Sequence, residues 1–84
     1  MPYITTLRRE SLNPAINALA KELERGTWGD MNYAITRLLR RRLEPGYEGA
    51  QAVMGCLESV KHEFYRRVVV PYEEIKKAQN GDVF

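Results

Sequence analysis

Hydrophobic residues recur at steps of three and four along most of the chain, which is the spacing of an α-helix. The first run, Ile16 to Leu23, predicts a helix over residues 14–25. Asn13 followed by Pro14 is a typical helix start, and Gly26 stands where a left-handed C-terminal residue belongs. Residues 2–12 show no clear period, so we expect them to precede the helix.

A second run follows the linker GTWGD and predicts a helix capped by Asp30. The run Arg40–Arg42 falls in its last turn, where cations interact favourably with the helix dipole, and Pro45–Gly46 should end it. The apolar stripe of this helix comprises Met31, Ile35, Leu38, Leu39 and Leu43.

A third and longer run begins near Glu48 and ends at Asn80–Gly81. Its apolar positions are Val53, Leu57, Val60, Phe64 and Val68. Pro71 should interrupt the pattern, because the residue before a proline avoids the helical region, yet the phase continues to Tyr72 and Ile75. Either one long helix kinks at Pro71 or a new helix starts there.

No segment alternates polar and apolar residues with period two, so the fold class predicted is all-α. At 84 residues we expect a single helical domain over residues 1–84, a small bundle of three to four helices. The long C-terminal helix would be kinked or broken at Pro71, with Phe64 and Val68 facing the core.

The composition is that of a soluble globular protein, with 44% hydrophobic and 29% charged residues. No apolar run is long enough to span a membrane, and MPYITTLRRE lacks the apolar segment of a signal peptide. The single cysteine, Cys56, excludes an internal disulfide and suits a reducing compartment. We therefore expect a cytoplasmic protein in which Cys56 is a buried small hydrophobe.

The charge is unevenly distributed. Residues 1–43 carry eight Lys/Arg against four Asp/Glu, and residues 44–84 carry five against seven. Such halves attract each other within one chain or across a dimer. The net charge of +2 is too small to favour nucleic acid, for which Arg40–Arg42 are the main argument.

Catalytic and metal-binding patterns are weak. Glu58 and His62 stand one helical turn apart, but His62 is the only histidine and no second ligand motif accompanies the pair. A helix-surface contact between them is the better interpretation. Cys56 lies almost two turns from His62 and has no base beside it. The sequence thus predicts no enzyme, no metal and no cofactor.

A row of small residues runs along the third helix. Glycine inside a helix costs about 1 kcal/mol relative to alanine, so its presence indicates close approach by something, most often another helix. We expect a homo-oligomer with this row as its interface, and a ligand lying against the backbone is the alternative. The row consists of Ala52, Gly55, Cys56 and Ser59.

Arginines and tyrosines form the candidate binding set. Arginine forks hold phosphates and aromatic rings stack on bases, so the set points to an anionic small molecule. The alternative is that these side chains cover the edges of a small core and that Arg66 or Arg67 pairs with Glu63. The candidate residues are Tyr33, Arg37, Tyr65, Arg66, Arg67, Tyr72 and Lys76.

Four segments carry a resemblance: the MPYI start, NYAITRL at residues 32–38, ESVKHEFYRRVVVPYE at 58–73 and NGDV at 80–83. In these the chain resembles a small uncharacterised family found in tailed-phage and bacterial genomes. The resemblance implies a phage setting but no activity. Several of the residues that match the family's motifs are polar and are not needed by a helical core, among them Asn32, Arg37 and Arg66. Their presence favours a binding role.

The leading functional prediction is a small non-enzymatic helical binding protein of phage type. It would sequester an anionic, nucleotide-like signalling ligand and so act as a counter-defence protein in the host cytoplasm. The alternative is an inhibitor or adaptor that acts on a host protein, with exposed Tyr and Arg as interface anchors. A nucleic-acid-binding accessory protein is the third prediction.

Overall fold

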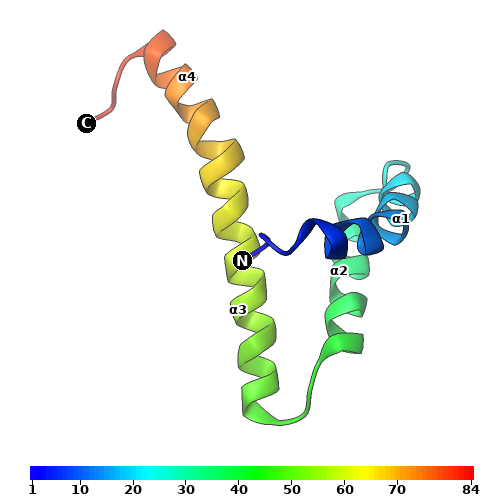
Figure 1. Cartoon of the computed structure of the whole chain (residues 1–84). Coiled ribbons are helices and arrows are strands. Elements are labelled where there is room, and N and C mark those ends of the chain that lie inside the picture. Colours follow the sequence, from blue (N-terminus) through cyan, green and yellow to red (C-terminus); the bar gives the residue numbers. More distant parts are fainter. The chain divides into compact units, whose positions relative to one another are not determined.

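The computed structural model describes residues 1–84, and all of its regular elements are helical (Figure 1). The predicted all-α fold class is therefore confirmed. The chain divides into two compact units, Pro2–Val53 and Met54–Phe84, the second of which also includes Met1. The elements are α1 (Thr6–Leu23), α2 (Trp28–Arg42), α3 (Gly46–Phe64), the π-helical turn η1 (Tyr65–Val69) and α4 (Val70–Asn80).

Helix α1 begins at Thr6 rather than at Pro14, so the predicted start of this helix was wrong. The Thr5 side chain caps the helix by accepting a hydrogen bond from the backbone N–H of Arg8. Pro14 lies inside the helix and removes one backbone donor. Residues 7–10 read Leu-Arg-Arg-Glu, all strong helix formers. With the cap, they outweigh the proline signal.

The turn between α1 and α2 is organised by a capping box. The Thr27 hydroxyl accepts from the N–H of Asp30 at 3.3 Å, and the Asp30 carboxylate accepts from the N–H of Thr27 at 2.9 Å. Thr27, not Asp30, is thus the N-cap. Gly26 does not have the left-handed conformation that its position predicted. An added Cβ there would instead lie 2.0 Å from the Asp30 carboxylate, so the close approach of Asp30 accounts for the glycine.

The connection from α2 to α3 depends on two glycines. Gly46 starts α3 with a φ of 89°, a conformation that favours glycine. A Cβ on Gly49 would lie 1.8 Å from the carbonyl oxygen of Glu44. Gly49 is also a buried residue, in the first turn of α3. The chain between the two helices therefore returns close to the α3 backbone at a point where a side chain does not fit.

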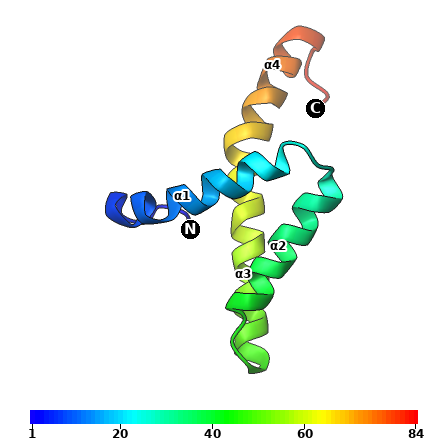
Figure 2. The same ribbon diagram turned by 90° about the vertical axis from the view of Figure 1, so that its right-hand side faces the viewer.

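Helix α3 continues through η1 into α4 as one long helix that bends at the π-helical turn (Figures 1 and 2). The N–H of Val70 bonds to the carbonyl of Tyr65, five residues back. Pro71 follows immediately; its ring would clash with the carbonyl four residues before it in a regular helix, and the wider turn makes room. The sequence did not decide between one helix kinked at Pro71 and two separate helices. In the structure the helix is continuous and bends there. Helix α4 ends before Gly81, whose φ is 92°.

No hydrophobic side chain of the chain is buried. Phe64 and Val68, which we expected to face a core, are 64% and 57% exposed. Cys56 is also exposed, so its predicted burial was wrong. The reason lies within Met54–Phe84 itself: its helical stretches follow one another end to end, so the unit contains no second helix to lie over the apolar face.

Candidate functional site

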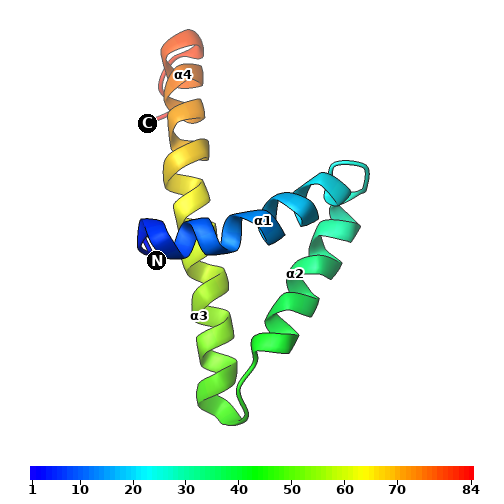
Figure 3. The same ribbon diagram turned by 45° about the vertical axis from the view of Figure 1, so that its right-hand side comes forward.

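A pocket of about 370 Å³ lies between α1 and α2 within the unit Pro2–Val53; we call it the α1–α2 groove. The two helices meet at the capped turn and diverge from it (Figure 3). The groove is lined by Leu19 and Leu23 of α1 and by Asp30, Tyr33, Ala34, Arg37, Leu38 and Arg41 of α2. Its floor is therefore apolar, and its cations come from α2 alone.

Tyr33, Arg37 and Arg41 stand at steps of four along α2, so they share one face of the helix. Neither arginine forms an ion pair, whereas Arg42 next to them bonds Glu44 at 2.9 Å. Asp30, the acidic residue of the groove, accepts the hydrogen bond of the capping box. Two adjacent guanidinium groups thus flank an apolar floor beside an aromatic ring that is 66% exposed.

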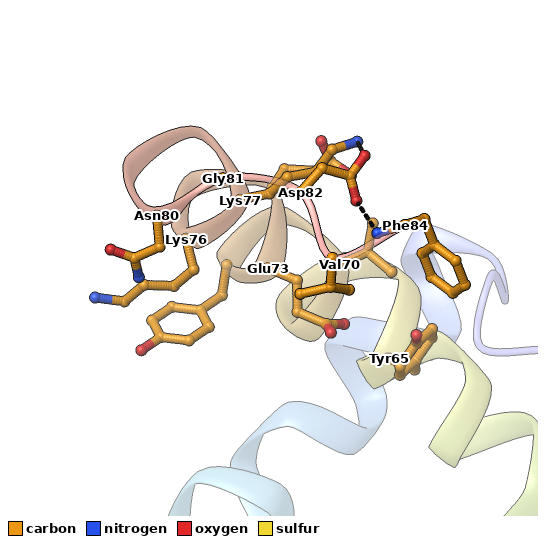
Figure 4. A pocket seen from close by; sticks show the side chains of 12 residues that line it. Tyr65, Val70, Glu73, Lys76, Lys77, Asn80, Gly81, Asp82 and Phe84 are labelled. Carbon is orange, nitrogen blue, oxygen red and sulfur yellow. Dashed lines mark hydrogen bonds and ion pairs between the residues drawn. The ribbon is translucent and has the colours of Figure 1, made fainter.

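A second, larger pocket of about 600 Å³ lies within Met54–Phe84, between α4 and the C-terminal residues that fold back along it; we call it the C-terminal pocket (Figure 4). Tyr65, Tyr72 and Lys76 all line it. The Lys76 ammonium lies 5.8 Å from the centre of the Tyr72 ring, within the range of a cation–π contact. The structure therefore brings together three of the predicted site residues.

The charges of the C-terminal pocket do not suit an anion. Glu73, Glu74 and Asp82 line it together with Lys76 and Lys77. Lys77 pairs with Asp82 at 3.5 Å, and the N–H of Phe84 bonds the Asp82 carboxylate at 3.0 Å, which ties the C-terminal residues to α4. Carboxylates outnumber ammonium groups here, so a phosphate would meet more repulsion than in the α1–α2 groove.

The three predicted arginines do not lie in one site. Arg66 bonds the Glu63 carboxylate one turn earlier, the pairing that the sequence left open. Arg66 and Arg67 do not line the C-terminal pocket. Arg37 belongs to Pro2–Val53, and Arg66 and Arg67 belong to Met54–Phe84. The sequence had treated all three as one set.

Sequence reasoning did not select several lining residues. Arg41 was noted only within the run Arg40–Arg42 and was left out of the binding set, although its spacing from Tyr33 and Arg37 was a sufficient signal. Leu19 and Leu23 were used only as part of the apolar spacing that predicted the first helix. Phe84 lines the C-terminal pocket only because the chain turns back after Gly81, which no periodicity indicates.

The small-residue row and the Glu58–His62 pair lie on the surface of α3. A Cβ on Gly55 would meet nothing within 4 Å, so no contact inside the chain requires glycine there. Glu58 contacts both His62, at 2.9 Å, and Lys61, at 3.8 Å. This is the helix-surface contact that the spacing indicated.

The fold is that of a small all-α protein with two pockets on its surface. None of its helices combines the length and apolarity needed to cross a bilayer. The chain belongs to the family described as "Domain of unknown function (DUF6899)", whose model matches residues 1–83. No curated protein and no solved structure matches the chain.

Proposed function

We propose that this chain is a small non-enzymatic binding protein that holds an anionic, nucleotide-like ligand in the α1–α2 groove. One observation carries the proposal: Arg37 and Arg41, neighbours on one helix face, form no ion pair and flank the same apolar floor. Like charges held one turn apart repel, and an anion between them removes that repulsion.

The groove offers each part of such a ligand a matching partner. The arginines donate charge-assisted hydrogen bonds to a phosphate. The Tyr33 ring is exposed at the same face for stacking against a base, and the leucines of α1 supply apolar contact. A cytoplasmic phage protein that captures a signalling nucleotide of the host would use such a site, and the resemblance of the MPYI and NYAITRL segments supports that setting.

Calorimetry with mono-, di- and cyclic nucleotides tests the proposal. Arg37→Ala and Arg41→Ala should each weaken binding by roughly ten- to a hundredfold, because each removes a charge-assisted hydrogen bond. Arg42→Ala is the matched control, since Arg42 pairs with Glu44 and does not line the groove. Absence of binding by the wild-type protein, or equal losses in all three variants, would contradict the proposal.

A second candidate function, binding of a host protein as an inhibitor or adaptor, is favoured by a different observation. The chain buries no hydrophobic side chain, and large residues such as Trp28, at 84%, and Tyr47, at 78%, are exposed. Exposed aromatics of this kind serve as anchors in protein interfaces. Mass spectrometry of the purified protein separates the two candidates: a released nucleotide supports the first, and a stoichiometric host protein supports the second.

A further inference from the structure

The charged residues of the α1–α2 groove form a row along α2, with an acid at one end and cations at the other. Asp30 stands in the first turn of the helix, and Arg37 and Arg41 follow it at seven and eleven residues. At about 100° per residue, the three positions lie within roughly 40° of one another round the helix axis. A ligand that lies along the groove therefore meets a carboxylate first and two guanidinium groups after it.

The Asp30 carboxylate has hydrogen-bonding capacity that the capping box leaves unused. Its Oδ2 atom accepts from the N–H of Thr27 at 2.9 Å, whereas its Oδ1 atom accepts no hydrogen bond within the chain. An ionised carboxylate only accepts hydrogen bonds, at about four lone-pair positions. Asp30 can therefore hold the cap of α2 and at the same time accept hydrogen bonds from donors of a ligand in the groove.

We infer that the groove selects a guanine nucleotide with at least two phosphates, an inference that rests on the nucleotide binding proposed above. Proteins recognise an unpaired base by hydrogen bonds to its Watson–Crick edge. Guanine alone presents two adjacent donors there, N1–H and the 2-amino group, which match a carboxylate that only accepts. Adenine and cytosine place an acceptor nitrogen beside their amino group, and the single donor of uracil lies between two carbonyl oxygens. Asp30 is thus the residue that determines the base.

The spacing along α2 fits a base at Asp30 and phosphates at the arginines. A helix rises about 1.5 Å per residue, so Arg37 lies about 10 Å beyond Asp30, and Arg41 about 6 Å beyond Arg37. In an extended nucleotide the ribose separates the amino edge of the base from the first phosphate by a comparable length, and a second phosphate continues in the same direction. The reverse orientation would bring the phosphates against the Asp30 carboxylate, which repels them.

Calorimetry of the full chain with guanosine diphosphate (GDP), adenosine diphosphate (ADP) and guanosine monophosphate (GMP) tests the inference. The wild-type protein should bind GDP about tenfold more tightly than ADP, whose base cannot satisfy the carboxylate, and about tenfold more tightly than GMP, which brings no phosphate to Arg41.

Asp30→Asn should abolish the preference for GDP over ADP. The amide oxygen still accepts from the N–H of Thr27, while the amide nitrogen donates to the acceptor nitrogen of adenine. Glu22→Gln is the matched control, because it removes a negative charge of the same unit that does not line the groove. The ratio of the two affinities should be unchanged in this variant.

The outcomes separate this inference from the proposed function. Wild-type protein that binds no nucleotide contradicts both. Equal wild-type affinities for GDP and ADP overturn the selection of guanine and leave nucleotide binding intact, and this measurement does not depend on how Asp30→Asn folds. A preference for GDP that survives Asp30→Asn overturns the role of Asp30, and GMP bound as tightly as GDP overturns the need for a second phosphate. A preference that Asp30→Asn removes and Glu22→Gln retains supports the inference.

Discussion

The units Pro2–Val53 and Met54–Phe84 are both helical, but their helices are held in different ways. In the first, specific backbone contacts define the turns: a capping box at Thr27 and Asp30, and the close approach of Glu44 to Gly49. In the second, the contacts on α3 join side chains one turn apart, such as Glu58 with His62. Local backbone contacts therefore define the turns of the first unit, whereas the long helix of the second exposes apolar residues such as Phe64 and Val68.

The largest expected effect comes from the tightest contact of the first region. Gly49→Ala should lower the free energy of unfolding by about 1–3 kcal/mol, because its Cβ would overlap the Glu44 carbonyl and the backbone would have to shift. Urea unfolding followed by circular dichroism measures this. Gly55→Ala is the control: its Cβ meets nothing within 4 Å, so it should stabilise the helix by about 1 kcal/mol. Equal changes in the free energy of unfolding of Gly49→Ala and Gly55→Ala would contradict a special role for the contact between Gly49 and Glu44.

The capping box should give a smaller effect. Thr27→Ala should cost about 1 kcal/mol, because the N–H of Asp30 loses the hydroxyl that accepts its bond. The same unfolding experiment measures the loss. Thr36→Ala, which removes an exposed hydroxyl in the middle of α2, should be neutral or slightly stabilising. A cost at Thr36 as large as that at Thr27 would show that the turn is not specially defined.

The smallest effect belongs to the second region. Glu58→Gln should cost only a few tenths of a kcal/mol, because it weakens exposed pairs with Lys61 and His62. The loss should disappear in molar salt, which screens surface charges. Glu74→Gln, at a carboxylate that forms no ion pair, is the control. If Glu58→Gln lowered the free energy of unfolding by more than about 1 kcal/mol, these ion pairs would stabilise α3 more than exposed pairs usually do.

Periodicity was enough to predict the helices and the end of the last one at Gly81, because spacing and glycine conformation are local properties. The start of α1 was not predicted, since Thr5 and Asn13 are both plausible caps and the helix formers between them decide the outcome. The core was wrongly predicted for Phe64 because a stripe shows which face is apolar, not what lies over it.

The candidate site was predicted in part. Tyr33 and Arg37, and separately Tyr65, Tyr72 and Lys76, line common pockets. Their division between two pockets was not predictable, because a helical spacing relates residues on one helix and says nothing of residues on another. For the same reason the sequence did not show that leucines of α1 line the α1–α2 groove. Arg41 could have been predicted, because it shares one helix with Tyr33 and Arg37.

The π-helical turn also has a consequence for how the length of this chain can vary. Deleting one residue between Tyr65 and Val69 would convert the wide turn into a regular one and leave α3 and α4 at the same rotation about the axis. The same deletion elsewhere in α3 would turn every later side chain by about 100°. Pro71 opposes the deletion, because a regular turn would bring its ring against the carbonyl four residues before it. Single-residue deletions should therefore be tolerated at η1 once Pro71 is replaced, and excluded from the rest of the long helix.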